Sequence, residues 1–110
     1  MRRGEIYWVN LDPVVGSEIG KRRPAIVLQN DLANHSSPTV TIVPLSTRVG
    51  RVYPFQVLIP ASTSGLDRDS KALCEQIRTV SKTRLLDMAG EISGPLLEAI
   101  RTALDRHLWH

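Results

Sequence analysis

The first eighty residues of the chain contain several short apolar runs that follow one another closely. The polar segments between these runs are predicted to be turns and not helices. The runs are rich in β-branched or alternating apolar side chains and are bounded by Gly, Pro, Asn and Asp, which is typical of strands. Several such strands in succession predict a small antiparallel barrel or a strongly curled sheet. The five predicted strands cover residues 4–11, 24–31, 39–47, 55–60 and 71–80, with Pro44 marking a bulge or an edge in the third.

Residues 93–110 have the periodicity of a helix instead. Ser93 is placed to cap this helix, and Pro95 stands in its first turn, where a missing N–H is tolerated. We expect the helix to lay one apolar stripe on the barrel and Trp109 to lie in the core or at an interface. Residues 81–88 are predicted to form a short turn or helix capped by Ser81. The fold class is therefore mainly β with a C-terminal α-helix. The stripe consists of Leu96, Leu97, Ile100, Leu104 and Leu108.

Length and composition indicate one ordinary globular unit. With 110 residues, 42% of them hydrophobic, the chain is long enough for one core and too short for two, so residues 1–110 are predicted to form a single domain. No stretch resembles a signal peptide or a membrane span. The single cysteine, Cys74, lies in an apolar segment and cannot form an intramolecular disulfide. We therefore expect a reduced core residue and a cytoplasmic location.

The net charge of +3 lies entirely in the first half of the chain. Residues 1–55 hold seven Lys or Arg against four Asp or Glu, whereas residues 56–110 hold seven against seven. A polyanion or an acidic protein segment would fit this asymmetry as a partner. A solvated basic face fits it equally well.

Signals for metal or cofactor chemistry are absent from the sequence. The three histidines, at positions 35, 107 and 110, do not combine with the cysteine into a metal-ligand spacing and are expected on the surface. No glycine-rich nucleotide-binding motif occurs. We therefore predict neither a metal nor a cofactor.

A long charged loop, residues 12–22, leads into the second strand, with Arg23 and Pro24 at its end. Loops of this length in a compact domain usually have a function or are disordered. The planar guanidinium of Arg23 can hold a phosphate at two points and stays charged. Ser46 and Thr47 end the third strand, where their hydroxyls could bind the same phosphate. Taken singly, each of these residues also fits a strand cap or a salt bridge.

Three segments, taken in order, resemble the MazF/PemK family of toxin–antitoxin systems. They are GEIYWVNLDPVVGSEIGKRRPAIVLQND (4–31), PLST (44–47) and DSKALCEQIRTVSKTRL (69–85). The resemblance implies a small SH3-like antiparallel barrel with a C-terminal helix, assembled as a homodimer. It also implies a toxin that is a metal-independent endoribonuclease and cuts single-stranded RNA, often mRNA, at short motifs. A cognate antitoxin would neutralise it by laying its tail across the RNA groove.

The resemblance carries roles to matching positions. Arg23 matches the catalytic arginine, and Glu18 matches a loop glutamate with an acid–base or positioning role. Ser46 stands where relatives commonly have threonine, which keeps the hydroxyl, and Thr47 is its alternative. Residues 48–54 lie where relatives diverge, so no cleavage motif is implied. The positions that match RNA-facing residues are Asn30, Ser70 and Gln76.

Lacking a metal-ligand spacing and a histidine pair, the sequence favours attack by the RNA's own 2′-OH on the neighbouring phosphorus. The products would be a 2′,3′-cyclic phosphate and a 5′-OH end. Arg23 would stabilise the charge that develops on the phosphoryl oxygens. A guanidinium is a poor proton acceptor, which leaves Glu18 as the candidate base. The loop 12–22 would then be a gate, most flexible at Gly16 and Gly20.

Two other functions fit parts of the sequence. CcdB-like toxins share this barrel but poison DNA gyrase through their C-terminal end, and the ending DRHLWH with Trp109 resembles that arrangement. A non-catalytic nucleic-acid-binding barrel would need exposed stacking aromatics. Only 5% of the residues are aromatic, and we expect Tyr7 and Trp8 in the core and interface. The combination of Arg23 with the hydroxyl of Ser46 favours the nuclease.

Overall fold

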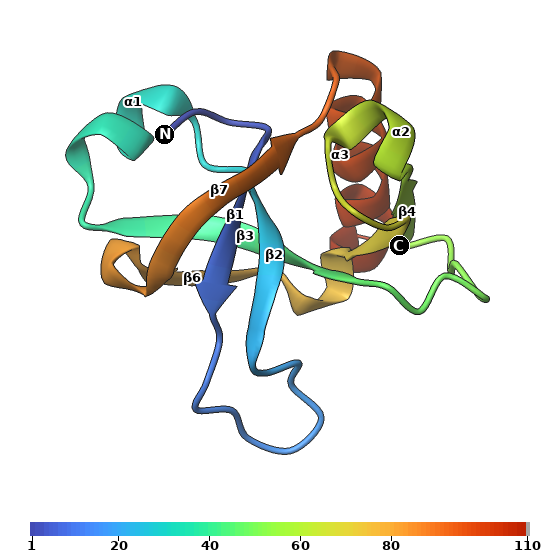
Figure 1. The fold of residues 1–110 in the computed structure, drawn as a ribbon, viewed down its shortest axis with the longest axis horizontal. Coiled ribbons are helices and arrows are strands. Elements are labelled where there is room, and N and C mark those ends of the chain that lie inside the picture. Colours follow the sequence, from blue (N-terminus) through green and yellow to red (C-terminus); the bar gives the residue numbers. More distant parts are fainter. Residues whose placement is uncertain (110) are drawn as a thin grey trace.

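A computed structural model describes residues 1–109 and shows a mainly β protein with a C-terminal helix (Figure 1), which confirms the predicted fold class. Within these residues the strands are β1 (Glu5–Asn10), β2 (Arg22–Val27), β3 (Thr39–Ser46), β4 (Gln56–Ile59), β5 (Ser70–Leu73), β6 (Arg78–Ser81) and β7 (Leu85–Glu91). The helices are α1 (Asp31–Ser36), α2 (Ala61–Ser64) and α3 (Gly94–Trp109). Two short 3-10 turns are η1 (Cys74–Gln76) and η2 (Lys82–Arg84).

Strand β3 is the centre of the sheet because it pairs with three other strands. The strand order is β4-β5-β3-β2-β1-β7, with β6 also paired to β3, and all pairings are antiparallel. Strand β6 pairs with β3 up to Ile42, and β5 pairs with it from Leu45. Pro44, which is buried and has no N–H, lies between these two pairings. The predicted irregularity at Pro44 is thus the place where β3 changes partners on one edge.

The sheet buries apolar side chains in two clusters, as expected for strands whose side chains alternate between faces. Ile26 belongs to the cluster that packs against α3, whereas its neighbours Ala25 and Val27 belong to the other. Cys74 is fully buried in the cluster beside α3, as predicted for a core residue. Helix α3 therefore covers one face of the curled sheet, and the β1–β2 loop extends away from the layers (Figure 1).

Helix α3 follows Ser93, whose carbonyl oxygen accepts the N–H of Leu97 at 3.0 Å. It has Pro95 in its first turn, as the sequence predicts. Its apolar stripe is buried at Ile100, but Trp109 at its end is 80% exposed and does not lie in the core. The last predicted helical residue, His110, lies outside the described residues. None of the helices within residues 1–109 is both long and apolar enough to cross a membrane.

The chain after β5 differs from the prediction. The expected strand 71–80 is interrupted by η1, because β5 pairs with the end of β3 and β6 with its beginning. The turn predicted at Ser81 forms as η2, where the Ser81 hydroxyl oxygen accepts the N–H of Thr83 at 3.3 Å. The helix alternative for 81–88 is wrong, since Leu85–Glu91 pairs with β1 as strand β7.

Two short helices also lie between the strands. Helix α1 begins at Asp31, the last residue of the strand predicted for 24–31, and that strand in fact ends at Val27. The Asn30 side chain caps α1 by accepting the N–H of Ala33 at 2.9 Å. Helix α2 spans four residues and ends at Gly65 in the left-handed region, with φ of 81°. Trp8, expected in the core or an interface, is 41% exposed.

Candidate active site

The register of β2 and β3 places the two strand-end residues of interest opposite each other. Ala25 pairs with Pro44, Ile26 with Val43 and Val27 with Ile42. Continuing this register by two positions brings Arg23 opposite Ser46. The start of β2 and the end of β3 therefore meet, although the two residues lie far apart in the sequence.

A cavity of about 520 Å³ opens at this junction. The loop contributes a carboxylate from Glu18, and the strand ends contribute guanidinium and hydroxyl groups. Two further cavities of about 430 and 470 Å³ are lined mainly by residues of α3 and contain neither Arg23 nor Ser46. The residues that line the cavity at the strand ends are Glu18, Ile19, Gly20, Arg23, Ser46, Thr47 and Arg48.

The Arg23 side chain is held in place before any ligand binds. It is half-buried, and its Nε–H donates to the Gly20 carbonyl oxygen at 2.9 Å. This bond fixes one edge of the guanidinium and leaves the terminal Nη groups for an anion. Within residues 1–109, neither Arg23 nor Arg48 forms an ion pair with a carboxylate. Both positive charges are therefore available to a phosphate.

The hydroxyl of Ser46 is oriented in a way that suits donation. Its side chain is only 8% exposed, and its oxygen accepts the backbone N–H of Arg48 at 3.2 Å. A hydroxyl that already accepts a bond keeps its own hydrogen to donate elsewhere. Thr47 beside it is exposed and lines the same cavity. Two hydroxyls thus lie on the wall opposite Arg23.

Glu18 is held by its own loop. Its Oε1 accepts the N–H of Val15 at 2.6 Å, and the Val15 carbonyl accepts the N–H of Glu18 at 3.3 Å. This reciprocal turn keeps an exposed carboxylate at the rim of the cavity. The position suits proton transfer or contact with a ribose hydroxyl.

The structure brings Arg23, Ser46, Thr47 and Glu18 into one cavity, with Gln76 at its edge. The Gln76 side-chain oxygen accepts the N–H of Ile19, a cavity residue, at 3.3 Å. Gln76 therefore contacts the loop in addition to any contact with RNA.

The other two predicted RNA-facing residues lie outside the cavity. Ser70, at 4% exposure, donates through its hydroxyl to the carbonyl oxygen of Arg68 at 3.2 Å. Asn30 caps α1 beyond the far end of β2. Its distance from Arg23 is roughly 20 Å, from about 3.3 Å per residue of strand.

Arg48 is a cavity residue that the sequence did not reveal. It lies in the loop after β3, where no periodicity or motif distinguishes one cation from another. The only sequence signal is its place two residues after Ser46, which allows the backbone contact to the Ser46 oxygen. Within residues 1–109, no group of three or more His, Cys, Asp or Glu side chains could hold a metal ion.

Together, the fold and the cavity define a small, mainly β protein whose strand ends and adjoining loop present guanidinium, hydroxyl and carboxylate groups to one cavity. A sequence model of the PemK-like, MazF-like toxins of type II toxin–antitoxin systems matches residues 2–108, so the chain belongs to this family.

Individual relatives agree with this family assignment. The chain is 46% identical to the endoribonuclease MazF9 of Mycobacterium tuberculosis, over 98% of this chain and 96% of that protein. The fold matches a crystal structure of MazF from Deinococcus radiodurans with a TM-score of 0.86, at 28% identity over 100% of this chain and 97% of that one. A mycobacterial endoribonuclease in complex with its cognate antitoxin matches with a TM-score of 0.79, at 26% identity over 98% and 94% of the two chains.

Proposed function

We propose that this protein is the toxin of a type II toxin–antitoxin system and an endoribonuclease that cuts single-stranded RNA at short sequence motifs. The observation that carries the proposal is the cavity in which Arg23 lies opposite the hydroxyl of Ser46. The 46% identity to a protein named endoribonuclease supports the same activity. Unpaired RNA is the expected substrate because its bases can be contacted directly, whereas the major groove of duplex RNA hides them.

The proposed reaction is an in-line transesterification within the RNA. The 2′-oxygen forms a bond to the adjacent phosphorus while the bond from phosphorus to the 5′-oxygen breaks. The proton of the 2′-OH passes to a base, for which Glu18 is the candidate. The 5′-oxygen takes a proton from water and leaves as a hydroxyl, and the hydroxide that remains is neutralised by the proton released from the base. Arg23 stabilises the negative charge on the phosphoryl oxygens, and the Ser46 or Thr47 hydroxyl donates to one of them. The products are a 2′,3′-cyclic phosphate and a 5′-OH end.

The proposal includes two protein partners. A cognate antitoxin is expected to inhibit by laying its tail across the RNA groove, and the antitoxin complex of a mycobacterial relative supports such a partner. A homodimer is supported by the apolar end of α3, where Leu108 and Trp109 are 58% and 80% exposed. A cytoplasmic location follows from mRNA as the proposed substrate.

The CcdB-like alternative is not favoured. Its functional end would be the C-terminal residues, whereas the matched family and the named relatives are MazF-type toxins and endoribonucleases. The non-catalytic binding barrel is not favoured for the same reason.

Incubation of the purified protein with a long single-stranded RNA in EDTA, followed by mapping of the new ends, tests the proposal. We expect discrete cuts with 5′-OH termini, and no cuts in an all-deoxy strand of the same sequence. Replacing Arg23 by Ala should lower the rate by about 100- to 1,000-fold, as for loss of one preorganised donor. Intact RNA in the presence of folded, antitoxin-free protein would contradict the activity. Wild-type cleavage by a folded Arg23→Ala variant would contradict the role of Arg23.

A further inference from the structure

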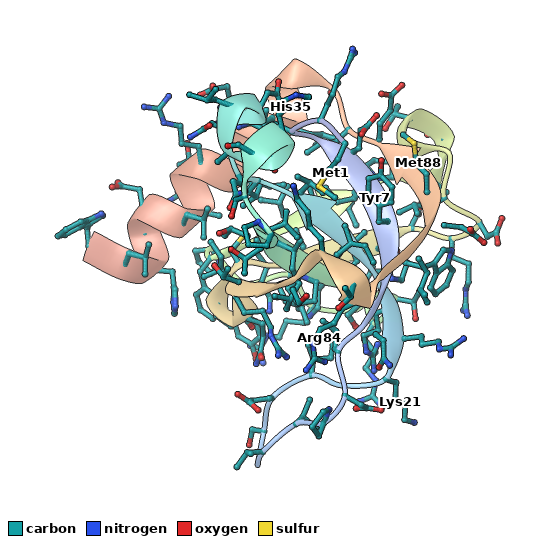
Figure 2. The ribbon with its side chains drawn as sticks, turned by 90° about the vertical axis from the view of Figure 1, so that its left-hand side faces the viewer. Met1, Tyr7, Lys21, His35, Arg84 and Met88 are labelled. Carbon is teal, nitrogen blue, oxygen red and sulfur yellow. The ribbon has the colours of Figure 1, made fainter. Side chains whose placement is uncertain are left out.

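The β1–β2 loop (residues 11–21) is exposed over most of its length, yet side chains from a later part of the chain hold its base. The Arg84 guanidinium donates through Nη1 to the carbonyl oxygens of Asn10 and Asp12, at 3.2 and 2.5 Å. The Arg78 guanidinium donates to the carbonyl oxygen of Leu11 at 3.3 Å. Three consecutive carbonyls at the end of β1 are therefore bound by two arginines from β6 and η2. In Figure 2, Arg84 lies beside the point where the loop leaves the sheet.

Asp12 then connects the two ends of the loop. Its Oδ1 accepts the N–H of Lys21 at 2.8 Å, and the Leu11 N–H donates to the Lys21 carbonyl at 2.9 Å. Lys21 has φ of 67°, in the left-handed region that residues other than glycine rarely adopt. The bond from Asp12 compensates for this unfavourable conformation.

Gly20 allows the contact between Asp12 and Lys21, and its own carbonyl oxygen contacts Arg23. A Cβ at Gly20 would lie 2.5 Å from the Asp12 carboxylate oxygen, so only glycine allows the carboxylate to approach. The Gly20 carbonyl oxygen is in turn the acceptor for the Arg23 Nε–H. The direction of that carbonyl depends on the Lys21 turn, because the two residues share one peptide unit.

We propose that Asp12 and Arg84 are positioning residues that orient the Arg23 guanidinium toward the cavity. The inference rests on the proposed function for its effect on rate. Arg84 fixes the backbone at Asp12, Asp12 fixes the Lys21 turn, and that turn directs the Gly20 carbonyl to Arg23. Neither Asp12 nor Arg84 lines the cavity, so each acts through Arg23.

Replacing Asp12 by Ala and by Asn gives a matched pair. The alanine variant loses the acceptor for Lys21, and we expect kcat for RNA cleavage to fall by about 10- to 100-fold, because small misplacements of a catalytic group have effects of this size. KM should change by less than about 3-fold, because Asp12 does not line the cavity. The asparagine variant keeps an acceptor oxygen and should retain a rate near that of wild type. Arg84→Ala should resemble Asp12→Ala, with a smaller loss, because Asp12 keeps its bond to Lys21.

Coupling to Arg23 separates positioning from a general structural effect. In the Arg23→Ala background, Asp12→Ala should cause little further loss of kcat. Additive losses, or a loss in Asp12→Asn equal to that in Asp12→Ala, would overturn the inference.

An NMR signal tests the same contact without catalysis. The Arg23 Nε–H resonance, assigned by its disappearance in Arg23→Lys, should exchange slowly with solvent in wild type and in Asp12→Asn. It should exchange faster in Asp12→Ala and in Arg84→Ala. An unchanged resonance in Asp12→Ala would overturn the positioning role even if wild type cleaves RNA. A protein that fails to cleave RNA but shows the expected exchange would contradict the proposed function and leave the positioning role supported.

Discussion

The side-chain oxygen of Gln76 accepts the backbone N–H of Ile19 at 3.3 Å, which ties η1 to the loop that carries Glu18. Replacing Gln76 by Ala should free this N–H, and amide hydrogen exchange at Ile19 should become faster. RNA cleavage should fall in the same variant, because the loop then samples more conformations around the cavity. Hydrogen exchange followed by NMR measures the first effect directly.

The variant Gln76→Glu is the matched control for that bond. A glutamate keeps an acceptor oxygen, so Ile19 should remain protected, whereas its negative charge near the cavity should weaken RNA binding. Equal exchange at Ile19 in wild type and in Gln76→Ala would show that the bond does not hold the loop.

Ser46 is expected to donate its hydroxyl hydrogen to a phosphoryl oxygen, since its oxygen already accepts the Arg48 N–H. Ser46→Ala should lower the cleavage rate by about 10- to 100-fold, the effect of losing one hydrogen bond to a charged group. Ser46→Thr keeps the hydroxyl and should stay within a few-fold of wild type. Single-turnover kinetics with a defined RNA measures the cleavage rate of both variants. If Ser46→Ala cleaves as fast as Ser46→Thr, the hydroxyl that donates to the phosphate is that of Thr47.

Arg48 supplies a second guanidinium to the cavity from an exposed loop position. Its loss should mainly weaken RNA binding, because a phosphate contact contributes through released counterions. For Arg48→Ala we expect the slope of log K against log salt concentration to become shallower by about 0.7, the value for one phosphate of a single strand. Arg51→Ala, outside the cavity, is the control; equal slopes in wild type and Arg48→Ala would argue against a phosphate contact.

The sequence predicted those parts of the fold that depend on local patterns. The strand around Ile42 and the helix around Ile100 were found where expected, whereas the strand around Ile26 covers Arg22–Val27 and not the predicted residues 24–31. Strand β7 was missed because its exposure is mixed and its pairing with β1 depends on contacts between residues about eighty positions apart. The interruption of the predicted strand 71–80 at Cys74–Gln76 was missed. An apolar run does not show where β3 stops pairing with one strand and starts pairing with another.

Part of the candidate site was also predictable from local sequence patterns. The ends of two strands point to Arg23 and Ser46, but only the register of β2 and β3 places them opposite each other. Asn30 has a local structural role that the sequence did not indicate, because its side chain caps α1. Its predicted contact with RNA stays a prediction. Asp12 and Arg84 could not be found, because their contacts join backbone groups that the sequence does not distinguish.

Gly90 on β7 packs directly against the backbone of α2. A Cβ at this position would lie 2.2 Å from the Ser64 carbonyl oxygen, which is too close for any side chain. Gly90→Ala should therefore lower the free energy of unfolding by about 1–3 kcal/mol, as for other overpacked sites. Gly50→Ala, with no atom within 4 Å of the added Cβ, should be close to neutral. Urea unfolding compares the two, and equal midpoints would contradict the contact.

Because of Cys74, the free energy of unfolding should depend on pH in the alkaline range. Burial, and secondarily the charge of Glu75, raises the pKa of this thiol from 9.0 to about 12. Between these values the unfolded chain has released the thiol proton while the folded chain retains it, so the unfolded state binds fewer protons. The free energy of unfolding should therefore fall as pH rises from about 9 toward 12, whereas below about 9 the thiol contributes no pH dependence.

Urea midpoints measured at pH 7 and pH 10.5 for wild type and Cys74→Ala test this dependence. The alanine variant leaves a small cavity and should be less stable at pH 7, but its midpoint should fall less between the two pH values. Tyr7, whose pKa burial also raises, contributes equally to both proteins and cancels in the comparison. Equal decreases in the two proteins would mean that the thiol titrates in the folded state much as it does in the unfolded chain.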